Sequence, residues 1–119
     1  MKHEIELLDS QIKPVIDELA KGSFDFGPEP SELLAQFYDK DETAKYLFDS
    51  FVAANANYEN TGVFVITDAH QLEKIYIDPP SRGKELIENR VFVFAIDGDG
   101  SFFGFGINSR MFYHFDFGT

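Results

Sequence analysis

Residues 91–107 read VFVFAIDGDGSFFGFGI, and this stretch decides the fold. Two runs rich in β-branched and aromatic residues, 91–96 and 101–107, flank the sequence Asp97-Gly98-Asp99-Gly100. Such runs favour strands, and Asp-Gly pairs supply the positive φ angles that tight hairpin turns require. The segment therefore predicts an antiparallel β-hairpin.

Further short elements are expected on both sides of this hairpin, because apolar runs alternate with turn residues from Gly62 onward. Together they predict an antiparallel meander over residues 62–117. The expected elements are strands at 63–67, 75–77 and 111–117, a helical turn capped by Asp68 and ending at Leu72, and a short helix at 84–89.

Residues 1–60 have helical periodicity instead. Apolar residues recur every three or four positions in the segments 5–19, 33–38 and 44–52, which is typical of amphipathic helices. With Ser10 as N-cap, Pro14 falls in the first turn, so the first helix is expected from Gln11 to about Lys21 after a short lead-in. Ser31 is expected to cap the second helix. The chain thus predicts an α+β fold with N-terminal helices packed on one face of a C-terminal antiparallel meander.

Length and charge limit the function classes. A chain of 119 residues fits one domain, mainly helical and acidic over 1–60 and mainly β over 62–117. Its formal net charge is −11, which disfavours direct binding to nucleic-acid phosphates or anionic membranes. The absence of cysteine excludes disulfides and thiol catalysis, and no apolar run is long enough for a signal core or a membrane span. We expect a cytoplasmic protein.

The glycine-rich hairpin does not match known cofactor loops. An EF-hand loop starting at Asp97 would need glycine where Phe102 stands and glutamate where Asn108 stands. Phe103 likewise occupies the place of the third glycine in a dinucleotide-binding G-x-G-x-x-G motif. A hairpin turn is therefore the preferred interpretation, and no cofactor is expected.

Two histidine–carboxylate pairs could each supply two metal ligands. His70 with Glu73, and His114 with Asp116, each share a face of a predicted element. Each pair offers two ligands, whereas zinc sites need three or four from the protein. We expect neither a metal site nor catalytic residues.

Gly104 and Gly106 leave one face of their predicted strand without side chains. The usual reason is close approach of another backbone or an aromatic ring. The alternative is a ligand groove beside His114 and Asp116, used by a small-molecule-binding domain or a small enzyme.

The terminal strand is rich in aromatic residues, and eight of the 14 phenylalanines lie from Phe92 onward. Alternation places its odd-numbered residues in the core, and Phe112 on the other face with His114 and Asp116. A bare Phe112 on an edge strand would favour a homo-oligomer joined through this strand. The residues expected in the core are Met111, Tyr113, Phe115 and Phe117.

The hairpin and the strand after it resemble the SUKH superfamily, which includes bacterial immunity proteins and eukaryotic cell-wall-assembly regulators. The similar parts are 91–104, with the Asp-Gly-x-Gly turn and a Phe-rich strand, and 108–115. Residues 64–72 are similar to the family's earlier strand and short helical turn, so the resemblance covers about residues 62–117. The family's Leu-Pro before its main helix and Asn-Gly after it have no clear counterpart. The resemblance implies an α+β, non-catalytic protein that binds and neutralises a toxin, often a nuclease.

Charge leads to the same hypothesis independently. Nuclease toxins must hold phosphate and tend to be basic, so an acidic inhibitor would be steered onto them. We expect the contacts to come from exposed carboxylates on the helical half and the hairpin turn. These candidate partner-binding residues are Asp39, Asp41, Glu42, Asp49, Asp97 and Asp99.

Overall fold

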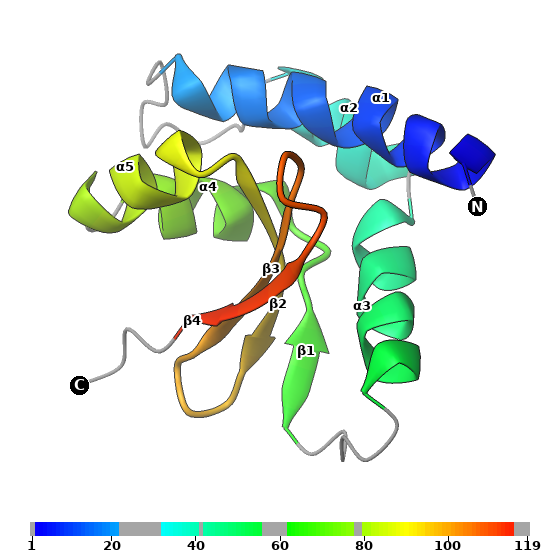
Figure 1. Ribbon diagram of the computed structural model, residues 1–119. Helices are drawn as coiled ribbons and strands as arrows, with labels where there is room; N and C mark the ends of the chain where they lie inside the picture. The colour runs from blue at the N-terminus through cyan, green and yellow to red at the C-terminus, as the bar shows by residue number, and fades with distance from the viewer. Residues whose placement is uncertain (1, 22–31, 41, 56–61, 78–79, 116–119) are drawn as a thin grey trace.

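The computed structural model describes residues 2–21, 32–40, 42–55, 62–77 and 80–115. Within these residues the chain forms five α-helices and one four-stranded antiparallel sheet of order β1-β2-β3-β4 (Figure 1). The α+β class and the antiparallel meander are thus confirmed. The helices are α1 (Lys2–Ala20), α2 (Glu32–Lys40), α3 (Thr43–Ala54), α4 (Ala69–Ile77) and α5 (Pro80–Glu88), and the strands are β1 (Val63–Val65), β2 (Val91–Asp97), β3 (Phe102–Gly106) and β4 (Phe112–Phe115).

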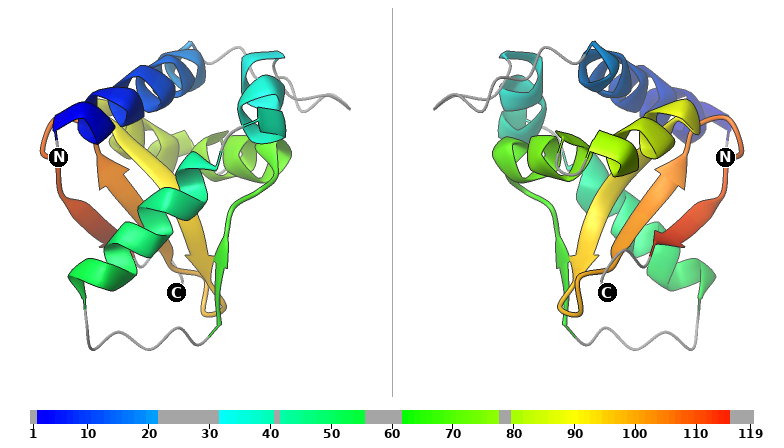
Figure 2. Two further views of the ribbon diagram at one scale, coloured as in Figure 1. Left: turned by 90° about the vertical axis from the view of Figure 1, so that its right-hand side faces the viewer. Right: turned by 90° about the vertical axis from the view of Figure 1, so that its left-hand side faces the viewer.

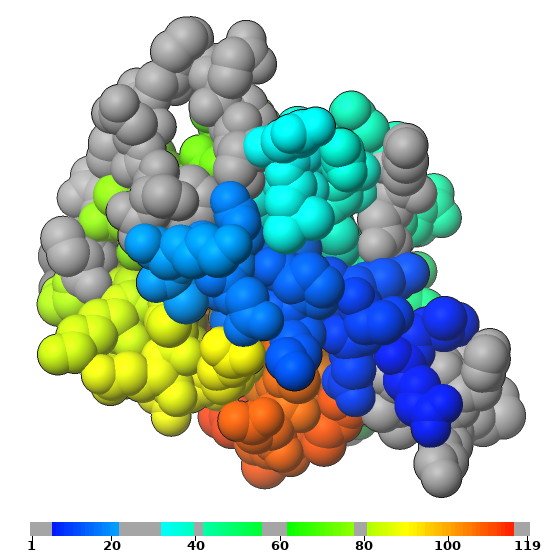
Figure 3. Space-filling view, turned by 90° about the horizontal axis from the view of Figure 1, so that it is seen from above, coloured from blue at the N-terminus to red at the C-terminus, as the bar shows by residue number. Residues whose placement is uncertain are grey.

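The helices surround one end of the sheet. α3 runs along one face, α1 crosses over the end of the sheet, and α4 and α5 lie on the side away from α3 (Figures 1 and 2). From above, α1 lies between α2 and α5, with the turn between β3 and β4 against its flank (Figure 3). The apolar faces of all these elements meet around β2, whose Phe92 and Phe94 are fully buried.

The predicted hairpin is confirmed as β2 and β3. Ile96 pairs with Phe102, and Gly100 in the turn has φ +92°, a conformation that suits glycine. Asp99 closes the turn, because its Oδ1 accepts hydrogen bonds from the Ser101 amide at 2.9 Å and the Ser101 hydroxyl at 2.6 Å. The local sequence therefore predicts this hairpin and its turn.

The first helix differs from its prediction. α1 begins at Lys2 and passes through Ser10 and Pro14 without interruption, and the Ser10 hydroxyl donates to the Leu7 carbonyl instead of capping a helix. Pro14 lacks the N–H that would bond the Ser10 carbonyl, which costs the helix one hydrogen bond. Burial of a continuous apolar stripe offsets that loss, because α1 carries five core residues on one face. They are Leu8, Ile12, Val15, Ile16 and Leu19.

The predicted strand at 75–77 is wrong, because these residues form the last turns of α4. Leu72, Ile75 and Tyr76 follow one another at helical spacing, and all three are buried. The helical turn expected to end at Leu72 therefore continues to Ile77, and α5 begins at Pro80 rather than at residue 84. Periodicity in so short an apolar run does not distinguish strand from helix.

The Tyr76 hydroxyl joins α4 to the sheet. Its hydroxyl donates to the Val91 carbonyl and accepts the Val93 amide at 3.0 Å. β1 pairs with β2 only at residues 95–97, so this part of β2 has no strand neighbour on that side among the described residues. The phenol takes the place of a strand there, because buried backbone groups require partners.

The outward placement of Phe112 is also wrong. Its ring packs against Phe51 of α3, at 5.7 Å between centroids, and against Phe94 and Phe105 of the sheet. α3 covers this face, so the apolar residues of β4 are divided between two faces. Met111, expected in the core, is 60% exposed instead. Asp116 and Phe117 lie outside the described residues.

Candidate functional site

Two acidic residues of α1 form ion pairs with distant parts of the chain. Asp17 accepts a hydrogen bond from Arg90 at 2.7 Å, and Asp9 pairs with Arg110. Both arginines precede strands and have positive φ angles, 52° and 59°, which are uncommon for a residue with a side chain. Each turn is thus fixed to α1 by its arginine, and each arginine offsets the charge of its carboxylate partner.

The acidic residues of α2 and α3 are arranged differently. Asp39 near the end of α2, Glu42 at the N-cap position of α3 and Asp49 within α3 are all exposed. None of them belongs to an ion pair among the described residues. Asp41 lies outside that part of the chain. Within the described part of the chain, the α2–α3 side therefore carries three exposed carboxylates outside any ion pair.

The two predicted hairpin residues do not join this group. The β2–β3 turn lies at the opposite end of the sheet from the junction of α2 and α3 (Figures 1 and 2). Asp97 is half-buried, and the exposed Asp99 bonds Ser101, whose hydroxyl and then amide lower the pKa of Asp99. The predicted contact set therefore divides into two separate places, and Asp99 has a structural role in its turn.

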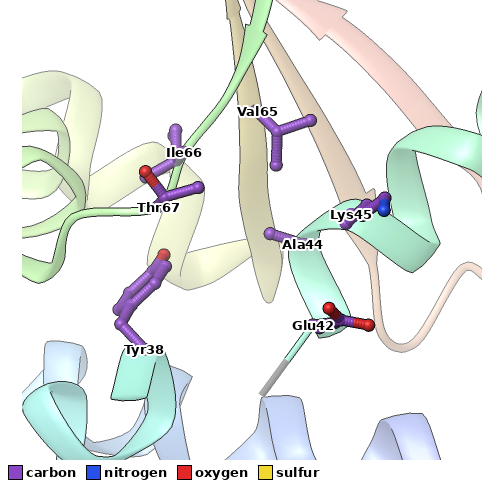
Figure 4. Close-up of a pocket in the computed structure, with 7 residues that line it drawn as sticks. All are labelled: Tyr38, Glu42, Ala44, Lys45, Val65, Ile66 and Thr67. Atoms are coloured by element: carbon purple, nitrogen blue, oxygen red, sulfur yellow. The ribbon is translucent and has the colours of Figure 1, made fainter. Parts of the chain in front are cut away.

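A small pocket opens beside Glu42. Residues from the end of α2, the start of α3 and the end of β1 enclose about 150 Å³. Tyr38 and Thr67 face the space from one side and Ala44 and Val65 from the other (Figure 4). The remaining lining residues are Glu42, Lys45 and Ile66.

The Tyr38 hydroxyl is the notable polar group of this pocket. It is buried, and it has no hydrogen-bond partner among the described residues. Burial raises its pKa above the ordinary value, and electrostatic interaction with Tyr76 and Asp68 raises the pKa further. The group therefore stays a neutral phenol, with no hydrogen bond among the described residues.

Sequence reasoning did not nominate Tyr38 or Thr67. In the sequence Tyr38 belongs to an apolar helical stripe, and Thr67 ends a β-type run, so both have ordinary structural explanations. Asp68 was expected to cap a helix and does so, accepting the His70 amide at 2.8 Å. No sequence signal shows that the three segments meet, because the pocket forms only when α2, α3 and β1 pack together.

The face of Gly104 and Gly106 offers no groove. A Cβ at Gly104 would lie 2.5 Å from Val91 Cγ1, and one at Gly106 would overlap Ser109 and the Tyr113 ring. Close approach of neighbouring groups, the usual reason for such glycines, is confirmed. His114 pairs with Phe103 in the β3–β4 register and stacks on its ring at 4.8 Å between centroids, so it lies on the opposite face of the sheet from Gly104. Asp116, its expected neighbour, lies outside the described residues.

Neither metal ligands nor membrane spans are found in the part of the chain that the structure describes. No group of three or more histidine and acidic side chains gathers there, and Glu73 is buried whereas His70 is exposed. None of the described helices has the length and apolar character needed to cross a bilayer.

Comparison with models of protein families finds no match to this chain. Neither curated proteins nor solved structures match it. The resemblance to the SUKH superfamily therefore stays a prediction.

Proposed function

We propose that this chain is a non-catalytic protein-binding module, an immunity protein that binds and neutralises a basic, nuclease-type toxin in the cytoplasm. One observation carries the proposal: arginines pair with Asp9 and Asp17 of α1, whereas Asp39, Glu42 and Asp49 are exposed and belong to no ion pair among the described residues. The net charge of −11 and the SUKH-like hairpin support the same function.

The charge distribution suggests how binding would proceed. Exposed, unpaired carboxylates attract a basic partner over a distance and raise its association rate. Pairs formed at the solvent-exposed rim add little to the lifetime of a complex. Reversing these charges is therefore expected to slow association more than it speeds dissociation.

The proposal is tested by capture followed by neutralisation. The tagged protein is used as bait in a lysate at low and high salt, and each captured basic protein is then expressed in a host cell with and without this chain. We expect a captured protein that stops growth alone and does not stop it when this chain is present. A captured protein that is harmless, or equally toxic in both cells, would contradict the proposed function.

A matched pair of variants tests the surface. Asp39→Lys with Glu42→Lys is expected to lower the association rate about tenfold at low salt, because two attractive charges become repulsive. Glu85→Lys with Glu88→Lys makes the same change in net charge on α5, away from α3. Equal slowing by both pairs would show that only net charge matters and would refute the α2–α3 surface.

Self-association is a second candidate, because two of the exposed large apolar side chains lie on or beside the edge strands of the sheet. Phe64 on the edge strand β1 is 69% exposed, and Met111 before β4 is 60% exposed. An oligomer joined through such residues would show concentration-dependent sedimentation that Met111→Lys abolishes. A sedimentation coefficient independent of concentration would exclude it.

A further inference from the structure

The two edges of the sheet differ in the apolar surface that they leave exposed. β1 forms one edge (Figure 2), and its Phe64 is 69% exposed, more than any other large apolar side chain of the described residues. β4 forms the other edge, but its Phe112 already packs against Phe51 of α3. The hydroxyl of Tyr113 in β4 likewise has a partner, Ser109. The edge at β1 therefore holds the apolar side chain that the fold leaves least covered.

The backbone of β1 has hydrogen-bonding groups on its open side. On either side of the strand, the Gly62 carbonyl accepts from the β2 segment at 2.8 Å and the Ile66 amide donates to it at 2.9 Å. Because bonding directions alternate along a strand, Phe64 also bonds toward β2. The amides and carbonyls of Val63 and Val65 therefore point away from the sheet, and no described strand lies on that side.

This edge is complementary to a second copy of itself. Val63 and Val65 lie one residue on either side of Phe64, so two antiparallel copies of β1 can exchange four backbone hydrogen bonds about a two-fold axis. Each Phe64 then lies opposite its counterpart in a non-hydrogen-bonded pair, in which cross-strand side chains are closest. Its ring points to the face away from Val65, which lines the pocket with Ala44 of α3, so α3 does not separate the two rings.

Charge favours a second copy over a basic protein at this edge. Residues 60–67 contain neither a charged side chain nor a proline, two of the devices that protect edge strands from pairing. A basic partner would find no carboxylate in the strand, whereas two uncharged strands can pair without placing like charges opposite each other. The net charge of −11 still makes the whole copies repel, so salt should strengthen their association.

We infer that this protein forms a two-fold dimer in which β1 pairs antiparallel with β1 of a second copy, joining two four-stranded sheets into one of eight strands. The dimer covers Phe64 and gives the outward amides and carbonyls of Val63 and Val65 their partners. It differs from self-association through Met111, which precedes the opposite edge strand, and it does not depend on the proposed toxin. Four hydrogen bonds and one pair of rings make a small interface, so we expect a weak dimer.

Sedimentation velocity over a series of protein concentrations tests the dimer. We expect the sedimentation coefficient to rise with concentration, and to rise further at high salt. Phe64→Lys removes the ring and places two like charges opposite each other, so it should raise the dissociation constant more than about tenfold. Met111→Lys is the matched control, because it makes the same change in charge at a side chain 60% exposed, and it should leave the dissociation constant unchanged.

Exchange of single amides tests the pairing. The amides of Val63 and Val65 should exchange with solvent more slowly as the protein concentration rises, because only the dimer bonds them. The amide of Phe64 bonds toward β2 in the monomer, so its exchange should not depend on concentration. Exchange at Val63 and Val65 that is also independent of concentration would refute the β1 pairing.

An introduced cysteine tests the register, because the chain has none of its own. The Cα atoms of a non-hydrogen-bonded pair are about 4.5 Å apart, which is within the range of a disulfide. Phe64→Cys should therefore form a disulfide dimer on mild oxidation faster than Met111→Cys does. Equal rates for the two variants would contradict the two-fold axis at Phe64.

The outcomes separate the dimer from the other proposals. A sedimentation coefficient independent of concentration would overturn the inference. Association that Met111→Lys abolishes and Phe64→Lys does not would support self-association but refute its assignment to β1. A dimer that requires Phe64, found when no captured protein is toxic, would support the inference and contradict the proposed function.

Discussion

Replacing Tyr76 by phenylalanine removes a hydroxyl that two backbone groups of β2 depend on. The Val91 carbonyl accepts its proton, and the Val93 amide donates to its oxygen at 3.0 Å. Tyr76, Val91 and Val93 are all buried, so water does not replace the lost oxygen. The phenyl ring remains, so packing changes little and the loss is mainly one of hydrogen bonding.

The expected loss of stability follows from the two backbone groups, the Val91 carbonyl and the Val93 amide, that would lose their hydrogen-bond partner. An unsatisfied buried donor or acceptor costs about 1–3 kcal/mol, so Tyr76→Phe should lower the free energy of unfolding by about 3 kcal/mol. The entropy of unfolding is about 2.1 cal/mol/K per residue, or about 0.25 kcal/mol/K for 119 residues. The midpoint of thermal unfolding should therefore fall by about 12 °C.

Tyr38→Phe is the matched control, because it makes the same chemical change where the hydroxyl has no partner. Removing an unsatisfied buried hydroxyl should raise the free energy of unfolding by about 1 kcal/mol. Both variants are measured by urea unfolding followed by circular dichroism, with unchanged slopes as the check on two-state behaviour. Equal destabilisation by the two substitutions would refute this account of both hydroxyls.

Three further outcomes are expected. Gly83→Ala should destabilise the protein by more than about 3 kcal/mol in urea unfolding, because a Cβ there would overlap the Tyr76 carbonyl and force α4 and α5 apart. A loss of stability below about 1 kcal/mol would contradict that packing. A double-mutant cycle on Arg90 and Asp17 should give a coupling of about 0.5–1 kcal/mol that weakens with salt, whereas zero coupling at low salt would exclude a stabilising ion pair. Burial raises the pKa of both Tyr38 and Tyr76, so the free energy of unfolding should be unaffected by these groups below pH about 10, where unfolded tyrosines begin to ionise. Above that pH it should fall by about 1.4 kcal/mol per pH unit for each tyrosine. Tyr76→Phe should reduce this slope, and an unchanged slope would contradict the assignment.

Much of the fold could be predicted because its signals are local. The hairpin follows from two β-type runs joined by Asp97-Gly98-Asp99-Gly100, and Asp99 and Gly100 act within that turn itself. The three N-terminal helices follow from apolar residues at helical spacing. Such patterns need no information from distant parts of the chain.

The predictions that were wrong concern residues whose structure depends on contacts with distant parts of the chain. Residues 75–77 have the composition of a strand, but they form the end of α4, from which Tyr76 bonds to β2. Pro14 suggests a break, yet the buried stripe of α1 keeps the helix continuous. Phe112 is covered by α3, an element about 60 residues earlier in the sequence.

The candidate site shows the same division. By itself the sequence determined the excess of negative charge, its concentration in the first half, the hairpin and the α+β class, because composition and short-range periodicity carry that information. Only the tertiary structure decided which carboxylates are neutralised, since Asp17 and Arg90 lie 73 residues apart and Asp9 and Arg110 lie 101 apart. It also brought Tyr38, Ala44 and Thr67 around one pocket, because a cavity is a property of packed surfaces and not of any single segment.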